Sequence, residues 1–268
     1  MNDITHPFGY YKFKGYKKTL FNVAQSLPKN KLLFKFSLVL RKLALQNKVR
    51  IVDAEILGIK ARFYPLDNVG DRFALFIPKY YEADEFELMA STLKKDSTFI
   101  DIGANTGVYS LMAAKNISKD GNIVAFEPNP VMAQRVELNA EFSGAKDKIK
   151  VLEIGVANEE KEFSLGLQDA NLGGASIVKE FDQGSIKVKC RPLLSVVEEL
   201  DIKKIDLLKI DIEEAEPLAM NPFFENAPRE LFPKMVFIES DKNIPFKELG
   251  YRFVKRTRAH NSIYELID

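Results

Sequence analysis

Acidic residues stand at the ends of apolar runs in this sequence, beside a turn rich in glycine. The stretch "FIDIGANTGVYSLMAAK", residues 99–115, places Asp101 just before Gly103 and Gly107. Glycine permits a tight turn and a close approach of backbone to ligand, and a helix beginning near Gly107 would present free N–H groups. A carboxylate at the end of an apolar strand is costly to bury without a cation or donors, so Asp101 indicates a positively charged ligand group. The alternative is a purely structural turn.

A second acid follows the next strand-like run, in "AFEPNP". The carboxylate of Glu127 can accept hydrogen bonds from both hydroxyls of a ribose, as acids do at this place in nucleoside-binding sheets. The dinucleotide fingerprint G-x-G-x-x-G needs glycine where Asn105 stands, which disfavours a nicotinamide cofactor. The two acids together predict S-adenosylmethionine, with Asp101 at its ammonium end and the glycine turn beneath its methionine chain. The alternative for Glu127 is a solvated loop acid.

The elements that must position these residues begin near Phe86, where short apolar strands start to alternate with helical stretches. This alternation is typical of an α/β fold with a doubly wound, mostly parallel sheet, in which ligands bind at the carboxyl ends of the strands. The predicted strands cover residues 98–102, 122–126, 149–154, 205–210, 234–239, 251–256 and 262–267. The predicted helices cover residues 84–94, 107–117, 130–142, 194–200, 214–225 and 245–249.

Two regions interrupt or precede this alternation. Residues 160–192 contain β-type stretches around the glycine-rich "DANLGGAS" and predict an antiparallel insertion that borders the site. Residues 1–80 predict a small helical and β appendage, distinct from a cofactor-binding domain over residues 81–268. Within it, "VRIVDAEILGIKARFYP" and "DRFALFIP" are β-rich and flank a turn signal at residues 67–70, which predicts an antiparallel pair.

Charge is distributed unevenly along the 268 residues, although the net charge is only +1. Residues 1–60 carry 12 Lys and Arg against three acids, so the remainder is acidic overall. The helix predicted within residues 29–50 mixes apolar and basic residues, which is compatible with peripheral membrane contact or with docking on the main domain with its lysine stems outward. We expect a cytoplasmic protein, since no apolar run approaches the ~20 residues of a membrane span and no signal peptide is recognisable.

The amino-acid composition disfavours several kinds of bound group. A single cysteine, Cys190, and two histidines, His6 and His260, disfavour a disulfide framework and a zinc site, so any metal would have oxygen ligands. The sequence lacks the interleaved aromatic and basic residues that would indicate nucleic acid binding. No metal site is predicted, and a role for Mg²⁺ stays open.

The motifs resemble those of the FkbM-type methyltransferases, S-adenosylmethionine-dependent enzymes of the class I methyltransferase fold that generally act on hydroxyl oxygens. The resemblance spans about residues 82–240. It rests on "FIDIGANTGVYSL", "VAFEPNP" with Asn139 downstream, "VANEEK", "IDLLKIDIEEAE" and the strand ending in Glu239. It implies a final antiparallel strand and a family-variable N-terminal element. The sequence departs from the family pattern at Glu214, which replaces a glycine, and at Ser195, which replaces an acid.

The residues predicted to hold the cofactor surround the two turns. They are Asp101, Gly103, Ala104, Asn105, Gly107, Glu127, Pro128 and Asn129.

The base for a hydroxyl acceptor should lie at the end of "LLKI", on a strand expected beside the first one. Asp211 is the first candidate, since a positioned carboxylate can accept the hydroxyl proton. Lys209 lies two residues earlier on the same strand face, where it could pair with Asp211 or hold an acidic substrate group. Glu213 and Glu239 are weaker candidates as base or oxygen ligand. His260 would serve as base only if its loop folds over the site.

Four acids lie within six residues here: Asp211, Glu213, Glu214 and Glu216. Such a cluster can collect a divalent metal, bind a cationic substrate group, or cap the helix that follows. The predicted function is an S-adenosylmethionine-dependent O-methyltransferase acting on a hydroxyl of a sugar, glycan or secondary metabolite. The alternatives are a non-catalytic S-adenosylmethionine-binding protein and, less favoured, an NAD(P)-dependent oxidoreductase. The sequence predicts no oligomeric state.

Overall fold

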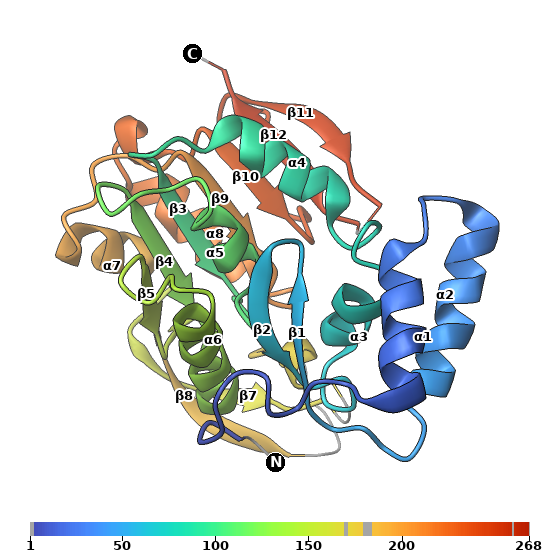
Figure 1. Ribbon diagram of the computed structural model, residues 1–268. Helices are drawn as coiled ribbons and strands as arrows, with labels where there is room; N and C mark the ends of the chain where they lie inside the picture. The colour runs from blue at the N-terminus through green and yellow to red at the C-terminus, as the bar shows by residue number, and fades with distance from the viewer. Residues whose placement is uncertain (1–2, 169–170, 179–183, 259, 268) are drawn as a thin grey trace.

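A seven-stranded sheet forms the centre of the computed structural model, which describes residues 3–168, 171–178, 184–258 and 260–267 (Figure 1). In spatial order its strands are β11 (Tyr251–Arg256), β12 (Ser262–Leu266), β10 (Met235–Ile238), β9 (Leu207–Ile210), β3 (Thr98–Ile102), β4 (Asn122–Phe126) and β5 (Ile149–Leu152). The five strands from β10 to β5 run parallel, and β12 is antiparallel to both of its neighbours. The predicted doubly wound, mostly parallel sheet with a final antiparallel strand is therefore confirmed.

The chain reverses its direction of travel across the sheet at β3. It proceeds outward through β4 and β5, and then returns to place β9 on the other side of β3. Loops at the carboxyl ends of β3 and β9 lead to opposite sides of this point, which opens a crevice for ligands in sheets of this type. The glycine turn follows β3, and Asp211 follows β9 directly.

Helices cover both faces of the sheet because its strands are apolar on both sides. Successive residues of a strand face opposite ways, so Phe99 and Phe237 belong to one core while Ile100 and Ile238 belong to the other. The first core includes residues of α4 (Ala83–Thr92), α5 (Val108–Ala113) and α6 (Pro130–Phe142). The second includes residues of α7 (Leu193–Glu199) and α8 (Glu216–Asn226).

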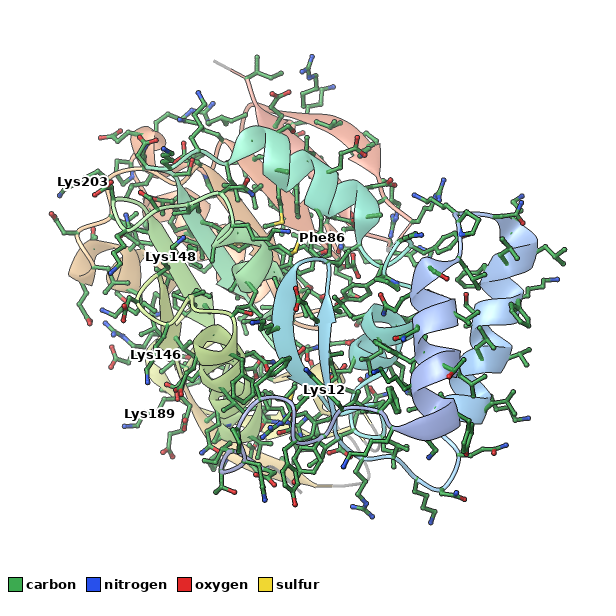
Figure 2. The ribbon with its side chains drawn as sticks, viewed as in Figure 1. Lys12, Phe86, Lys146, Lys148, Lys189 and Lys203 are labelled. Atoms are coloured by element: carbon green, nitrogen blue, oxygen red, sulfur yellow. The ribbon has the colours of Figure 1, made fainter. Side chains whose placement is uncertain are left out.

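Side chains divide between the interior and the solvent as this layering requires. Phe86 of α4 lies in the interior (Figure 2), with its ring centroid 5.1 Å from that of Tyr109 on α5. Lys146 and Lys203 lie at the periphery in the same view, and more than two thirds of each side chain is exposed.

The N-terminal region contains the helices α1 (Gly15–Ser26), α2 (Lys31–Ala44) and α3 (Val69–Phe76) and the hairpin of β1 (Val52–Ile56) and β2 (Ile59–Phe63). The antiparallel pair predicted across residues 67–70 is wrong. The hairpin turns instead at Leu57 and Gly58, whose φ angles of 51° and 75° fit a two-residue turn. "DRFALFIP" falls largely in α3, because Asn68 Oδ1 caps this helix by accepting from Asp71 N at 3.3 Å.

The hairpin is joined to the main sheet region through buried polar contacts. Arg62 of β2 is fully buried, and its Nε lies 2.7 Å from Asp53 Oδ1. Asn139 of α6 accepts from Arg62 N at 2.7 Å and donates to Thr106 O in the glycine turn at 3.0 Å. One apolar cluster runs from Ala24 of α1 through to the β12 strand. The division into two domains near residue 80 stays a prediction.

Replacing Asn139 with alanine should lower the free energy of unfolding by about 2–3 kcal/mol, because two buried backbone groups lose their partners. Urea denaturation of the two proteins measures this difference. Glu137→Ala is the matched control, since Glu137 is exposed on the same helix and its loss should cost less than about 0.5 kcal/mol. Equal stability of parent and Asn139→Ala would contradict the bridging role.

The insertion forms a separate three-stranded sheet of β6 (Gly155–Val156), β8 (Ser185–Arg191) and β7 (Lys161–Gly166). It is antiparallel between β7 and β8, whereas β6 is parallel to β8. A single bridge at Ser176 represents the predicted stretch "ASIVKEF", the end of which lies outside the described residues. Two 3₁₀ turns, η1 (Leu172–Gly174) and η2 (Arg229–Leu231), complete the regular structure.

Two helix predictions need correction. The helix predicted over residues 245–249 is only a turn, which ends at Gly250 with a φ of 78°. The predicted helix 107–117 ends at Ala113, because the N–H groups of Lys115 and Asn116 bond the oxygens three residues back, those of Met112 and Ala113. No helix in the described ranges is both long and apolar enough to cross a membrane.

Candidate active site

The turn after β3 adopts a backbone conformation that requires glycine. Gly103 has a φ of 77°, and a Cβ atom on it would lie 2.1 Å from the backbone oxygen of Asp211. The N–H groups of Gly103 and Ala104 both donate to Phe126 O at 3.0 Å. Gly107, with a φ of 82°, precedes α5. Only glycine lets the first turn approach β9 this closely, so the turn and Asp211 form one continuous surface.

Glu127 lies at the carboxyl end of β4, 7% exposed, with its carboxylate on the wall of a cavity. One oxygen accepts from Asn105 N at 2.8 Å and the other from Asn129 N at 3.0 Å. A carboxylate offers about four acceptor sites, so two remain for a ligand. Burial raises the pKa of Glu127 to about 7, despite these donors. Asn129 also caps α6 by accepting from Val131 N at 3.0 Å.

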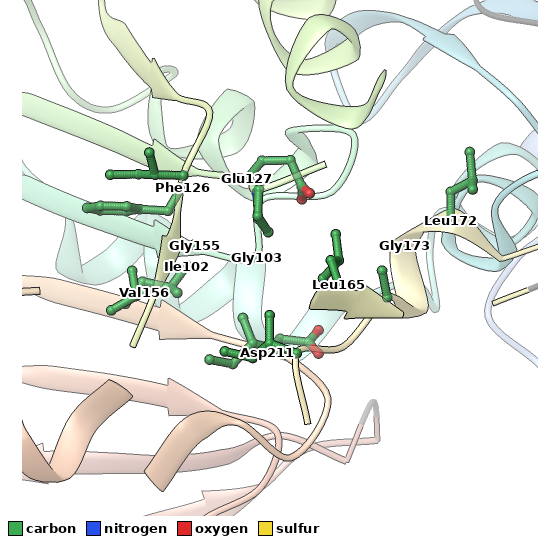
Figure 3. A pocket seen from close by; sticks show the side chains of 15 residues that line it. Ile102, Gly103, Phe126, Glu127, Gly155, Val156, Leu165, Leu172, Gly173 and Asp211 are labelled. Carbon is green, nitrogen blue, oxygen red and sulfur yellow. The ribbon is translucent and has the colours of Figure 1, made fainter. Parts of the chain in front are cut away.

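The cavity lies between the carboxyl ends of β3, β4 and β9 and the insertion (Figure 3). Glu127 and Asp211 stand on opposite walls, with Gly103 between them. The apolar part of the lining is formed by Ile102, Phe126, Pro128, Ile154, Val156, Leu165, Leu172, Ala175, Ile177 and Ile212. The interior space is narrow, about 40 Å³, and the volume reaches about 520 Å³ when the open mouth is included. The insertion lines this cavity, as expected if the cavity is the site.

Asp101 points away from this cavity, toward α5. It is fully buried, and Ser110 Oγ donates to its Oδ2 at 2.7 Å. Its Oδ1 accepts no hydrogen bond from any residue that the structure describes, and the nearest cation, Lys209 Nζ, lies 3.8 Å away. Burial raises the pKa of Asp101 although Lys209 opposes this. An additional donor or cation would satisfy Oδ1.

Lys209 joins the residues at the ends of β3 and β9. Its Nζ donates to Gly103 O at 2.9 Å and lies 3.6 Å from Asp211 Oδ2, so the predicted pairing with Asp211 is confirmed. The Lys209 side chain is 5% exposed and that of Asp211 is 40% exposed. Asp211 is thus the carboxylate of this group that solvent and ligands reach.

Glu239 follows β10 and lies beside Asp211. Burial, together with the charge of Asp211 and a hydrogen bond shared with it, raises the pKa of Glu239 to about 8. The raised pKa favours the protonated form of Glu239, in which its carboxyl can donate a hydrogen bond to Asp211.

The acidic cluster after β9 mainly shapes the start of α8. Glu216, fully buried, accepts from Ile212 N at 3.0 Å, which is a capping contact. Glu213 and Glu214 have φ angles of 57° and 76°. The backbone at Glu214 thus adopts a region that favours glycine, the residue of the family pattern. No three His, Cys, Asp or Glu side chains in the described part of the chain are arranged to hold a metal.

Two residues that the sequence did not single out lie beside this group. Glu82, just before α4, accepts from Tyr109 Oη at 2.8 Å, and burial raises its pKa to about 8. Lys209 Nζ lies over the Tyr109 ring, 5.2 Å from its centroid. Glu82 is one of four acids within six residues, so its sequence gives no signal. Ser195, by contrast, lies away from this group. Its Oγ donates to Pro192 O at the start of α7, and it does not line the cavity between Glu127 and Asp211.

The sequence of this chain matches the profile of a known protein family. The profile described as "Methyltransferase FkbM domain" matches residues 101–267, which include the glycine turn, Glu127, Asp211 and the final antiparallel strand. The chain belongs to the FkbM methyltransferase family.

Two characterised proteins have sequences similar to that of this chain. Methyltransferase sdnD of Sordaria araneosa is 24% identical over 204 residues, which cover 65% of this chain and 75% of that protein. The AMB antimetabolite synthetase AmbE of Pseudomonas aeruginosa is 26% identical over 179 residues, 53% of this chain. This chain spans only 8% of the length of AmbE.

Solved structures resemble this FkbM family member at low identity. The methyltransferase FkbM of Methylobacillus flagellatus KT has a TM-score of 0.41 at 16% identity, with 74% of this chain and 55% of that chain covered. An RNA methyltransferase of Salinibacter ruber, solved with S-adenosylhomocysteine, has a TM-score of 0.37 at 15% identity, with 68% and 87% covered.

Proposed function

We propose that this protein is an S-adenosylmethionine-dependent O-methyltransferase. One observation carries the proposal: Glu127 and Asp211 face each other across the cavity at the point where the chain reverses across the sheet. The residues fit the cofactor. Glu127 has acceptor sites left for two ribose hydroxyls, the apolar wall suits an adenine ring, and the turn at Gly103 admits backbone contact with a ligand. Asp101 was expected at the ammonium end of the cofactor, but its carboxylate is fully buried and points away from this cavity, so no contact with the cofactor is assigned to it.

The bound cofactor supplies an electrophilic methyl group and leaves as S-adenosylhomocysteine. The residues of this chain position the acceptor and take its proton. Asp211, exposed to the cavity, accepts the hydroxyl proton in this proposal, and Lys209 stabilises its charge from 3.6 Å. Glu239, whose pKa is raised to about 8, orients Asp211 in this proposal by a hydrogen bond from its protonated carboxyl. Glu213 stays a weaker candidate, and the acceptor class is a hydroxyl on a sugar, glycan or secondary metabolite.

The affinity for S-adenosylhomocysteine should increase with pH. Ribose hydroxyls donate to the ionised carboxylate, but burial raises the pKa of Glu127 to about 7 in the free protein. Below that pH each binding event must first remove a proton, so the dissociation constant should rise about tenfold per pH unit, or about 30-fold between pH 8.5 and pH 5.5. Calorimetric titration across this range measures it. Glu127→Gln should give a flat profile, and a flat profile in the parent would contradict an ionised Glu127 as the ribose ligand.

The non-catalytic alternative makes a different prediction from the enzyme. A protein that binds S-adenosylmethionine but releases no S-adenosylhomocysteine with any hydroxylated compound of a broad panel would favour it. Binding of NADH, with none of S-adenosylhomocysteine, would favour the oxidoreductase.

We also propose that α2 contacts a membrane surface. Four of its apolar residues recur at helical spacing on one side and are exposed, by the fractions given: Leu32 75%, Phe36 45%, Val39 53% and Leu43 38%. Exposed basic residues lie beside this stripe at Lys31, Lys35 and Lys42. An apolar stripe flanked by positive charge suits the interface of an anionic bilayer.

Sedimentation with vesicles tests this contact. The parent should bind vesicles containing phosphatidylserine more tightly than vesicles of phosphatidylcholine alone, and Phe36→Glu should reduce that binding about tenfold. Val254→Glu, at an exposed apolar position on β11, is the control. Equal binding by parent and Phe36→Glu would overturn the proposal.

A further inference from the structure

A second cavity lies beside the carboxylates, on the α5 side of the sheet, with a volume of about 450 Å³. This volume falls within the usual range for small-molecule sites. Most of its wall is apolar or aromatic and comes from the N-terminal region and the segment before α4: Phe34, Phe73, Ile77, Tyr80 and Tyr81. The family profile begins at residue 101, so it includes none of these five residues.

Glu82 connects this cavity to the reaction centre. It lines the cavity, and its φ of 45° turns the chain just before α4. Its carboxyl accepts from Tyr109 Oη, over whose ring Lys209 Nζ lies. The charges of Asp211 and Lys209 both act on Glu82, and that of Asp211 also acts on Tyr81. A molecule in the cavity therefore lies next to the group that contains Asp211.

Arg258 and His260 lie on the wall of the same cavity, between two residues that form buried hydrogen bonds. Thr257 Oγ1 and Asn261 Nδ2 both donate to Glu85 Oε1 on α4, and Thr257 N donates to Asn261 O at 2.8 Å. Thr257, Asn261 and Glu85 are each less than 7% exposed. Thr257 and Asn261, which flank Arg258 and His260 in the sequence, are thus both anchored to α4.

Arg258 lies on the cavity wall without an ion-pair partner among the described residues. Within the described residues it forms no ion pair and no hydrogen bond, whereas Arg62 and Arg135 both pair with acids. A guanidinium on the wall of an aromatic cavity binds a carboxylate strongly, because its planar donors match the two oxygens. The cavity thus combines a carboxyl at Glu82, an aromatic wall and a cation.

Resting on the proposed function, we infer that this cavity binds the methyl acceptor, and that the acceptor is an apolar hydroxy acid. Its hydroxyl lies toward Glu82 and Asp211, its hydrocarbon or aromatic body packs on Phe34 and Phe73, and its carboxylate pairs with Arg258. Aromatic walls with a single cation select such a molecule over a neutral sugar, which would leave Arg258 unpaired and many hydroxyls without partners.

Titration of the full-length protein with two hydroxy acids tests this inference, with and without S-adenosylhomocysteine. The probes are 4′-hydroxybiphenyl-4-carboxylate and 12-hydroxydodecanoate, each compared with its primary amide. At least one acid should bind about ten- to a hundredfold more tightly than its amide, and Arg258→Gln should abolish this difference while the amide binds as before. Arg256→Gln, an exposed arginine on the neighbouring strand, should preserve the difference.

Three outcomes overturn the inference: neither acid binds, acid and amide bind equally to the parent, or glucuronate binds more tightly than both apolar acids. The titrations separate this result from a failure of the proposed function. If S-adenosylhomocysteine binds and the acids do not, only the acceptor class is wrong. If the acids bind and S-adenosylhomocysteine does not, the cavity is a hydroxy-acid site but the methyltransferase proposal fails.

Discussion

Glu127→Ala should weaken the binding of S-adenosylhomocysteine by about 10²–10³-fold. Each hydrogen bond from a ribose hydroxyl to a buried carboxylate contributes about 1.5–3 kcal/mol, and every 1.4 kcal/mol is tenfold in the dissociation constant. The substitution also removes the acceptor for the Asn105 and Asn129 N–H groups, which loosens both turns around the cavity. Isothermal titration calorimetry of parent and variant measures the change.

Two further variants separate a binding role from a folding role. Glu127→Gln preserves the size of the side chain and one carbonyl acceptor, so it should bind about tenfold more weakly than the parent and unfold at a similar temperature. Glu225→Ala, an exposed position on α8, should bind as the parent does. If Glu127→Ala is folded and binds S-adenosylhomocysteine normally, the cofactor lies elsewhere.

Asp211→Asn should reduce the rate of methyl transfer by about 10²–10⁴-fold, the usual contribution of a general base. The amide cannot accept the hydroxyl proton, although it fills the same space and can still accept from Glu239. Binding of S-adenosylhomocysteine should change less than about threefold, because Asp211 acts on the acceptor and not on the nucleoside. The measurement is the single-turnover rate with an acceptor that the parent methylates.

Glu213→Gln is the matched control for this experiment. Glu213 lies two residues later, in a left-handed backbone conformation, and its loss should cost less than about tenfold. If Asp211→Asn retains the parent rate while Glu82→Gln loses it, the base is Glu82, which lines the second cavity and has a pKa raised to about 8. Parent rates in both variants would leave no base among these carboxylates and contradict the proposed chemistry.

The central sheet was predictable because its signals are local. The strands at residues 98–102 and 122–126 and the helix at 130–142 agree with the structure, since each combines an apolar run with a glycine, asparagine or proline boundary. The segment "DRFALFIP" was not, because its aromatic and aliphatic residues suit a strand as well as a buried helix, and only the cap at Asn68 decides between them.

The second cavity, which Glu82 and Arg258 line, depends on contacts between distant parts of the chain. Glu127 and Asp211 follow recognisable strands, so their place at the cavity could be predicted. Glu82 and Arg258 could not. Glu85 and Thr257, which hold the loop of Arg258 against α4, are 172 residues apart in sequence, and neither segment carries a pattern that indicates the other.

The buried contacts of the hairpin have a consequence for how the N-terminal region can be studied. Arg62 donates to the backbone oxygens of Asp3, His6 and Pro7, and one apolar cluster continues from α1 into the sheet. Removing the first 50 residues would therefore take away three backbone acceptors of a buried guanidinium, leaving it only Asp53, and would open the shared core. The whole chain should melt in a single cooperative transition. Truncation would thus report on folding, and only point substitutions on the outer face of α2 isolate what that helix contacts.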